Sequence, residues 1–470
     1  MSTKHSIAAE QFLKGERAPW HDETLWMVRA KRDTMSRSLP EWEDLRNAAA
    51  ALKDYSNSHL ADLLEEFERN ATAAGVQVHW ACDAKEFCET VASILDEHGV
   101  KHLVKSKSML AEECELNPYL EAHGIEVAET DLGERILQLL HEKPSHIVLP
   151  AIHLRKEEIG DLFRREGMSV EPGNNDQTYL THAARHDWRH KFLEAGAAMT
   201  GCNFAVAETG ECVVCTNEGN AEMGTSQPKL QITAFGLEKI VPDRRSLGVF
   251  TRLLARSATG QPVTTYTAHY RKPRPGGEMH FIIVDNGRTD ILANTEHVKM
   301  LNCLRCGACM NTCPVYRRSG GYSYTYFIPG PVGINLGMLK DPVRYSDNVS
   351  ACSLCHSCQN VCPAKVDLAD QIYRWRQVLD SYGVANKAKK RISEAMDFVI
   401  ERPRLFGAAL HGAHWVNALP HWLVYNRLND WGKEHEMMHF PKESFSEMWK
   451  KKEVKPARFT EKSREQHDEQ

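Results

Sequence analysis

Two identical runs of cysteines constrain this 470-residue chain more than any other feature of its sequence. Each run follows the spacing Cys-x2-Cys-x2-Cys-x3-Cys and ends directly before a proline. The first run comprises Cys303, Cys306, Cys309 and Cys313, and the second comprises Cys352, Cys355, Cys358 and Cys362. Three thiolates at this spacing can surround one iron–sulfur cubane, while the fourth, next to the proline, reaches the other cubane. The runs therefore predict two 4Fe–4S clusters.

The same rule predicts a crossed assignment of the eight thiolates. Cluster 1 is expected to take Cys303, Cys306, Cys309 and Cys362, and cluster 2 to take Cys352, Cys355, Cys358 and Cys313. Zinc is a poorer explanation, because a structural zinc site usually uses two CxxC pairs and leaves the repeated Cys-Pro unexplained. A c-type haem attached at Cys352–His356, or a disulfide framework, would require an exported protein. Adjacent clusters suit one-electron hopping, so the module is expected to conduct electrons and not to catalyse alone.

The remaining composition is that of an ordinary globular protein. Hydrophobic residues make up 42% and charged residues 26%, and the net charge of −5 indicates neither nucleic acid nor an anionic membrane as a partner. Residues 1–5 lead into no apolar signal region. The most apolar late stretch, 406–425, is interrupted by histidines and a proline, so we expect a buried or partner-facing helix pair and no transmembrane segment. We expect a cytoplasmic protein whose fourteen cysteines stay reduced.

Hydrophobic periodicity divides the chain into four segments. They are a helical N-terminal arm over 1–75, an α/β domain over 76–295, a dicluster ferredoxin-type domain over 296–400, and a helical extension with a charged, disordered tail over 401–470. In the α/β domain, strand-like residues 76–80, 101–105, 125–129 and 146–150 alternate with helical stretches 84–98, 109–122 and 135–141, which predicts a parallel sheet. Later strands are expected over 203–208, 211–216, 230–235, 264–270 and 280–285, with a hairpin at Thr209-Gly210 and one helix over 247–258.

The dicluster segment is expected to be mainly α-helical. About 38 residues separate Cys313 from Cys352, too many for a minimal ferredoxin hairpin. The flanks favour helix, notably 367–382, where Asp367 can serve as the N-cap. The other six cysteines (Cys82, Cys88, Cys114, Cys202, Cys212 and Cys215) are interpreted as small buried residues. Cys212 and Cys215 cannot share a metal while they lie on a regular strand, because residues three apart face opposite sides of it.

Polar side chains follow three predicted strands of the α/β domain. Lys105, Lys107 and Ser108 open a helix after one strand, Glu129 and Asp131 follow the next, and Asn217, Glu218 and Asn220 form a turn after a third. Ligands bind beyond the carboxyl ends of strands in open α/β sheets, and hydroxyl, amide and ammonium groups there suit an anion. The three segments are candidates for one cofactor-binding pocket. The alternative is that they are solvated caps and turns.

Several stretches resemble the lactate-utilisation (LUD) domain, and the order of motifs is similar to that in the B-type iron–sulfur subunit of the three-part bacterial L-lactate oxidation system. The stretches are 105–109, 129–134, 201–210, 216–220 and 236–239, with 320–324 and 329–333 between the cysteine runs. The resemblance implies an α/β LUD fold like that of the CoA-transferase and ribose-5-phosphate-isomerase superfamily. It adds Glu208 to the candidate pocket. It also implies a cytoplasmic complex that oxidises L-lactate to pyruvate, with a cysteine-rich heterodisulfide-reductase-like subunit and a small LUD-domain subunit as partners.

Three functions compete on the sequence alone. The first is an electron-transfer subunit of an L-lactate dehydrogenase complex, not catalytic alone and enabling growth on lactate. The second is an electron-transfer subunit of another dehydrogenase or reductase, of the glycerol-phosphate or heterodisulfide type. The third is a redox or ligand sensor, although no basic stripe for DNA supports it. Whether the pocket takes lactate, a nucleotide or a flavin stays open.

Overall fold

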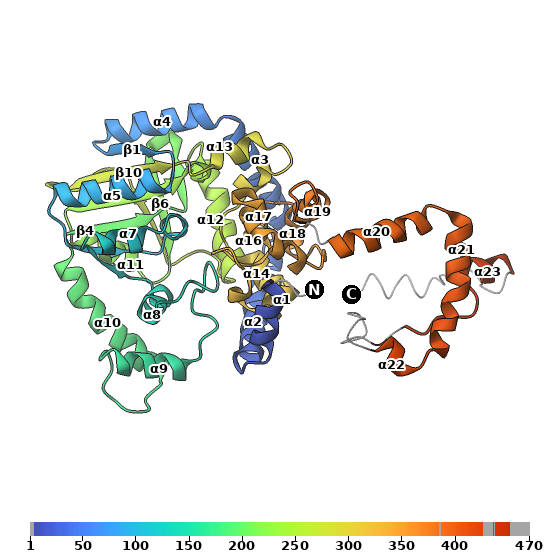
Figure 1. Cartoon of the computed structure of the whole chain (residues 1–470). Coiled ribbons are helices and arrows are strands. Elements are labelled where there is room, and N and C mark those ends of the chain that lie inside the picture. Colours follow the sequence, from blue (N-terminus) through green and yellow to red (C-terminus); the bar gives the residue numbers. More distant parts are fainter. Residues whose placement is uncertain (1–3, 385–386, 426–435, 437, 452–470) are drawn as a thin grey trace. The chain divides into compact units, whose positions relative to one another are not determined.

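The computed structural model describes residues 4–384, 387–425, 436 and 438–451, and it divides into two compact units after Val384 (Figure 1). The first unit contains both the α/β part and the cysteine runs. The second unit contains the C-terminal helices and is described separately. The domain boundaries expected at 75, 295 and 400 stay predictions, and the division after Val384 falls within the segment expected to be the dicluster domain.

The N-terminal arm is helical, as predicted. Its helices are α1 (Lys4–Leu13), α2 (Arg17–Arg37), α3 (Trp42–Ser58) and α4 (Leu60–Ala73). Leu60, Leu64 and Phe67 recur at helical spacing and are buried, so the amphipathic face of α4 packs into the core. Helix α4 contacts strand β1 of the α/β part, whereas α1 and α2 contact the segment that follows the first cysteine run.

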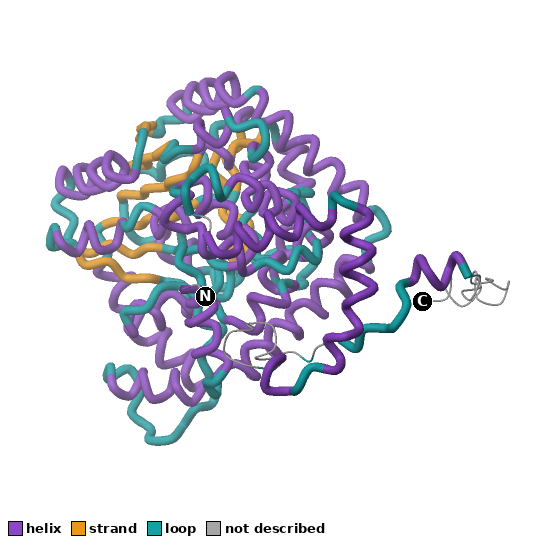
Figure 2. The backbone as a smooth tube through the Cα atoms, turned by 45° about the vertical axis from the view of Figure 1, so that its right-hand side comes forward, coloured by secondary structure: helices purple, strands orange, loops and turns teal. Residues whose placement is uncertain are grey.

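A sheet of six parallel strands forms the centre of the α/β part, which confirms the predicted fold class (Figure 2). Its order is β1 (Gln77–Ala81), β10 (Glu278–Val284), β7 (Leu230–Gly236), β4 (Ala197–Gly201), β2 (His102–Lys105) and β3 (Glu126–Glu129). Apolar residues cover both faces. Phe87 and Leu116 pack with Ile282 in one cluster, and Phe67 packs with Phe281 in another, because neighbouring residues of β10 point to opposite faces.

The α/β part also contains helices. They are α5 (Ala84–Glu97), α6 (Met109–Glu113), α7 (Leu116–Ala122), α8 (Leu132–Leu140), α9 (Lys156–Arg165), α10 (Gln177–Glu194), α11 (Asn220–Ser226), α12 (Arg244–Ala258) and α13 (Arg288–Ala293). The single helix expected over 109–122 is broken into two, because Glu115 adopts a left-handed conformation with φ of 54°. Strand β4 was not expected, since its sequence Ala-Ala-Met-Thr-Gly has little of the β-branched character that marks a strand.

The strand expected over 146–150 is wrong. This segment is irregular, because the Nδ1 of His146 accepts hydrogen bonds from the backbone N–H groups of Val148 and Leu149, each at 3.0 Å. Those N–H groups are therefore used by a side chain and do not join a sheet. The segment lies instead against the first cysteine loop, where a Cβ on Gly307 would come within 2.9 Å of the His146 ring.

A second sheet has four strands in the order β8 (Ile240–Val241), β5 (Phe204–Val206), β6 (Glu211–Thr216) and β9 (Tyr266–Tyr270). Strands β5 and β6 are antiparallel, as the hairpin prediction requires. Their connection is a 3-10 turn, η1 (Ala207–Thr209), followed by Gly210 with φ of 62°. A Cβ on Gly210 would collide with the backbone of Ala71, so only glycine fits between this turn and α4.

The cysteine-rich part is mainly α-helical, as predicted. Its helices are α14 (Ala308–Thr312), α15 (Pro314–Ser319), α16 (Gly330–Lys340), α17 (Pro342–Tyr345), α18 (Ser357–Val361) and α19 (Leu368–Val378), with 3-10 turns η3 (Val298–Asn302), η4 (Gly321–Ser323) and η5 (Ser346–Ala351). Asp367 occupies the N-cap position of α19, but its side chain does not cap the helix. Its Oδ1 accepts a hydrogen bond from Nε2 of Gln371 at 2.7 Å.

The second compact unit consists of α20 (Lys387–Ile400), α21 (Pro403–Gly412), η6 (Ala413–Ala418), α22 (His421–Val424) and α23 (Phe445–Lys450). Helices α21 and α22 contain no buried residue, so burial does not explain the apolar stretch 406–425. The charged tail 452–470, expected to be disordered, lies outside the described residues. No described helix is long and apolar enough to cross a membrane.

Candidate functional site

The two cysteine runs fold in the same way. In each, an extended loop carries the first two cysteines, one helical turn carries the third, and the fourth precedes proline. Arg305 and Leu354 occupy equivalent places between the first two cysteines and have φ of 58° and 55°. Gly307 and His356 are also equivalent, with φ of 74° and 58°. The repeat in sequence is therefore a repeat in backbone conformation, including left-handed positions that side chains rarely adopt.

Backbone N–H groups point at the sulfur of the first and the last cysteine of each run. Arg305 N lies 3.4 Å from the Sγ of Cys303, and Leu354 N lies 3.3 Å from the Sγ of Cys352. Likewise, Tyr316 N lies 3.5 Å from the Sγ of Cys313, and Val366 N lies 3.3 Å from the Sγ of Cys362. Donors aimed at sulfur favour the thiolate over the thiol, and hydrogen bonds of this kind also tune a cluster's potential.

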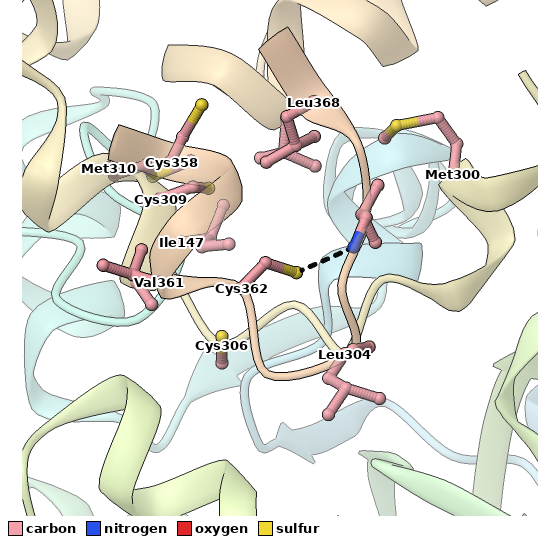
Figure 3. Close-up of a cluster of buried hydrophobic side chains, with 14 of the residues drawn as sticks. Ile147, Met300, Leu304, Cys306, Cys309, Met310, Cys358, Val361, Cys362 and Leu368 are labelled. Carbon is pink, nitrogen blue, oxygen red and sulfur yellow. Dashed lines mark hydrogen bonds between the residues drawn. The ribbon is translucent and has the colours of Figure 1, made fainter. Parts of the chain in front are cut away.

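The fourth cysteine of each run lies beside the first cysteines of the other run. Cys303, Cys306, Cys309 and Cys362 line one small cavity, together with Val332, Pro363 and other apolar residues. Figure 3 shows Cys306 and Cys362 side by side, with the dashed line from Cys362 marking its bond to a backbone nitrogen. Burial and then the neighbouring Cys303 raise the pKa of the Cys362 thiol to about 11.

The other four thiols form a group nearer to the surface. Burial raises the pKa of the Cys313 thiol to about 11, and Cys352 and Cys355 contribute to that rise. Burial also raises the pKa of Cys358, with Cys313 as the next cause. Cys355 is exposed, whereas Cys306, Cys309 and Cys362 are buried. Cys303 is half-buried, so the group around Cys313 is more open to solvent than the group around Cys362.

The donor set fits iron–sulfur cubanes. All fourteen cysteines are free thiols, and seven of the eight in the two runs, all but the exposed Cys355, lie in or against one apolar cluster. Among the described residues, no three cysteine, histidine or acidic side chains converge closely enough to hold a single metal ion. A cubane does not require such convergence, because each thiolate binds a different iron.

A buried ion pair lies at the carboxyl ends of strands β2 and β3. Lys105 Nζ is 2.7 Å from Glu129 Oε1, and both side chains are almost completely buried. Burial opposes the charge on Lys105, but Glu129 and Glu112 outweigh it and raise the lysine pKa. Nearby, burial raises the pKa of Glu134 to about 7, although Lys107 lies 3.4 Å away.

A cavity of about 250 Å³ opens above this ion pair. Its lining includes six of the sequence-predicted residues, namely Lys107, Ser108, Asp131, Asn217, Glu218 and Asn220. The structure thus brings three separate segments to one cavity. Lys105 and Glu129 lie outside the lining. Glu208 is also outside it, and its Oε2 accepts a hydrogen bond from Arg244 N at 3.3 Å.

The opposite wall of the cavity was not foreseen from the sequence. It contains Lys239, Arg288, Arg305 and Cys306. Arg288 is buried, and its guanidinium pairs with Glu113 at 3.0 Å and with Glu238. These carboxylates raise the pKa of Arg288 against the effect of burial. The signal was present in the 236–239 stretch and in the arginine inside the first cysteine run, but only the fold brings them together.

One hydrogen bond ties the α/β part to the first cysteine run. Because His146 Nδ1 accepts from the backbone, its Nε2 carries the proton, and Nε2 lies 3.0 Å from Asn311 Oδ1. Burial and then Lys107 lower the pKa of His146 to about 3, so the ring is neutral near pH 7. Asn311 is on α14, two residues before Cys313.

The fold and the two cysteine loops define a LUD-domain protein with two 4Fe–4S clusters. Residues 64–291 match the LUD domain family, and residues 299–366 match the 4Fe-4S dicluster domain family. The chain belongs to the lactate utilization protein B family. It is 41% identical over 378 residues to lactate utilization protein B of Geobacillus thermodenitrificans, covering 78% of this chain and 79% of that protein.

Two further similarities accompany this assignment. The chain is 38% identical over 436 residues to an uncharacterized electron transport protein, YkgF, of Escherichia coli K12, covering 90% of this chain and 91% of that protein. A solved structure of a DUF162 family protein from Deinococcus radiodurans has a TM-score of 0.27 and 16% identity, covering 48% of this chain and 98% of that chain. That structural likeness is too weak to support an argument.

Proposed function

We propose that this chain is the iron–sulfur electron-transfer subunit of a cytoplasmic complex that oxidises L-lactate to pyruvate and enables growth on lactate. The observation that carries the proposal is the pair of equivalent cysteine loops, each facing the last cysteine of the other, in a member of the lactate utilization protein B family. The cytoplasmic placement is supported by fourteen free thiols.

The crossed ligation is part of this proposal. Cluster 1 is bound by Cys303, Cys306, Cys309 and Cys362, and cluster 2 by Cys352, Cys355, Cys358 and Cys313. The two clusters then share two protein segments, which keeps them close enough for an electron to pass between them. Oxidation of lactate to pyruvate releases two electrons and two protons, and each cluster carries one electron at a time. Two clusters therefore pass the pair onward in single steps.

The proposed partners are a cysteine-rich heterodisulfide-reductase-like subunit and a small LUD-domain subunit. The exposed Cys355 marks the edge of cluster 2 as the place where an electron enters or leaves toward a partner. Three of the four cluster 1 cysteines are buried and Cys303 is half-buried, so cluster 1 is the inner cluster of the pair.

The test is to isolate the complex anaerobically, identify its subunits and add L-lactate while the clusters are followed by EPR. Lactate should reduce the clusters and yield pyruvate, whereas D-glycerol phosphate should not. If lactate leaves the clusters oxidised with all subunits present, or if a strain lacking this gene still grows on L-lactate, the proposal fails. Reduction by glycerol phosphate or by a dithiol would instead assign the chain to another dehydrogenase or reductase.

A further inference from the structure

The 250 Å³ cavity and the proposed cluster 1 site share a wall. Ile147 and Cys306 belong to the lining of both the larger cavity and the small cavity of Cys303, Cys309 and Cys362. A molecule in the larger cavity would therefore lie against the protein ligands of cluster 1. The group of thiols around Cys313 contributes no residue to this lining.

The wall next to cluster 1 has an excess of positive charge. Arg288 is matched by Glu113 and Glu238, but Lys239 and Arg305 have no carboxylate of their own. In the part of the chain that the structure describes, Nη1 of Arg305 is buried without a hydrogen-bond partner, and the Lys239 ammonium forms no ion pair. Lys53 adds a further buried cation, which donates to the backbone oxygen of Glu238. Lys53 lies outside the lining, so three cations of this wall (Lys239, Arg288 and Arg305) face two carboxylates (Glu113 and Glu238), while the rest of the lining adds Lys107, Asp131 and Glu218.

Such an excess is costly unless an anion balances it, because a buried charge without a partner loses its hydration. Arg305 lies between the proposed cluster 1 ligands Cys303 and Cys306, so a bound cluster would take part of this charge. Lys239 and Arg305 nevertheless line the larger cavity as well, where a second anion can reach them. The planar fork of an arginine suits a carboxylate, which it can bind through two parallel hydrogen bonds.

The far wall supplies a different kind of group. Asn220 is 8% exposed and lines the cavity, and its Oδ1 has no hydrogen-bond donor among the described residues, although its Nδ2 donates to Thr130 Oγ1 at 3.3 Å. A free acceptor opposite free cations suits a ligand with a hydroxyl group and a carboxylate. The cavity volume of about 250 Å³ lies below the roughly 300–1,000 Å³ that is typical of sites for drug-sized ligands, which suits a small ligand.

We propose that this cavity binds a small hydroxy- or keto-carboxylate, directly beside cluster 1. The choice of L-lactate and pyruvate as probes rests on the proposed function, whereas the carboxylate class rests on the cavity itself. The inference concerns binding alone, so no bond is formed or broken in it. Because a bound anion disfavours an added electron nearby, occupancy should lower the reduction potential of cluster 1 and leave cluster 2 nearly unchanged.

The experiment uses the full chain with both clusters loaded and kept anaerobic. Binding of L-lactate, pyruvate or inorganic phosphate is measured by calorimetry, and each cluster is followed by EPR during a redox titration with and without the probe. A carboxylate should bind and shift only the cluster 1 potential downward. Lys239→Met should weaken that binding about tenfold or more, in line with the loss of a charged hydrogen bond. Lys85→Met, which changes a lysine that is 79% exposed, should leave it unchanged.

Asn220→Asp provides a second variant in case Lys239→Met folds poorly, because an added negative charge on the far wall should also abolish carboxylate binding. Binding of phosphate alone would overturn the carboxylate assignment. Binding of no probe, with cluster 1 still shifted by Lys239→Met, would mean that the cations serve the cluster only, and the inference fails. Carboxylate binding to the isolated chain, without reduction by lactate in the whole complex, would sink the proposed function and uphold this site.

Discussion

Nε2 of His146 lies 3.0 Å from Oδ1 of Asn311, and this bond joins the α/β part to α14, the helix that carries Cys309 of the first run. Both side chains are buried. Asn311 Nδ2 also donates to the backbone oxygen of Ala258 at 3.4 Å. Asn311→Leu removes both bonds and should lower the stability of the cluster-loaded protein by about 1–3 kcal/mol or more, the cost of leaving a buried polar group without a partner. The urea midpoint measures this, with iron content as the control. An unchanged midpoint would show that the bond adds nothing.

Replacement of the fourth cysteine of each run by serine tests the crossed ligation. Cys362→Ser should damage the cluster whose other ligands are Cys303, Cys306 and Cys309, and Cys313→Ser should damage the other cluster. EPR of the reduced proteins and iron analysis distinguish the two, and Cys82→Ser serves as the control because Cys82 is exposed and outside both runs. If each serine removes the cluster nearest in sequence, the ligation is not crossed.

Arg305 and Leu354 allow a matched test of how charge sets the cluster potentials. They occupy equivalent left-handed positions, so giving either position the residue type of the other keeps the loop conformation. Arg305→Leu should lower the potential of cluster 1 by roughly 60 mV, which corresponds to a tenfold change in a one-electron equilibrium. Leu354→Arg should raise that of cluster 2. Potentiometric EPR titration gives both values, and a rise after Arg305→Leu would contradict the electrostatic argument.

Replacement of only one residue of the buried ion pair between Lys105 and Glu129 is expected to lower the stability of the protein strongly. Lys105→Met leaves Glu129 as an unpaired buried charge, which should destabilise the protein by about 3–5 kcal/mol. The double variant Lys105→Met/Glu129→Gln should recover much of that loss, because no buried charge then remains. Urea unfolding of the parent protein, the single variant and the double variant measures these losses. Equal losses in the single and double variants would rule out the pairing as the cause.

Stability should fall in mild acid, and His280 contributes to this fall together with the buried His146. Burial and then His79, whose Nε2 lies 3.0 Å from His280 Nδ1, lower the pKa of His280 from 6.5 to about 4. Glu278, Glu97 and His98 also face this ring. In the unfolded chain His280 binds a proton below about pH 6.5, whereas in the folded chain it does so only below about pH 4. The free energy of unfolding is therefore highest above pH 6.5 and decreases as the pH falls from 6.5 to 4.

The size of this effect is about 1 kcal/mol after screening by water at the partly hydrated pair. His280→Gln should flatten the decrease in urea midpoint between pH 6.5 and pH 4. His182→Gln, which changes an exposed histidine on α10, should keep the slope of the parent protein. A parent protein whose midpoint is constant over this range would contradict the assignment.

The order and class of the elements could be predicted from the sequence because apolar period and turn residues act locally. The parallel sheet and the helical dicluster part followed from that logic. The strand over 146–150 was wrong because a histidine side chain, and not a neighbouring strand, takes up the backbone N–H groups. Strand β4 was missed because small residues carry little strand preference and owe their pairing to the neighbours β2 and β7.

The cluster cysteines could be found from the sequence because binding of a cubane requires a particular spacing of the cysteines. The cavity wall could not, because Lys239, Arg288 and Arg305 are far apart in sequence and meet only when the sheet packs on the first cysteine loop. Glu208 was selected by its place in a motif, but the 3-10 turn that carries it faces α12 and not the cavity.

The equivalent backbone of the two cysteine loops has a consequence for how this protein can change. The conformation at Arg305 and Leu354 is imposed by the surrounding loop, and it accepts a long cation in one copy and an aliphatic chain in the other. A single substitution at either position can therefore change the electrostatic environment of one cluster while the backbone of both loops is preserved. Duplicated loops of this kind can diverge in driving force without diverging in shape.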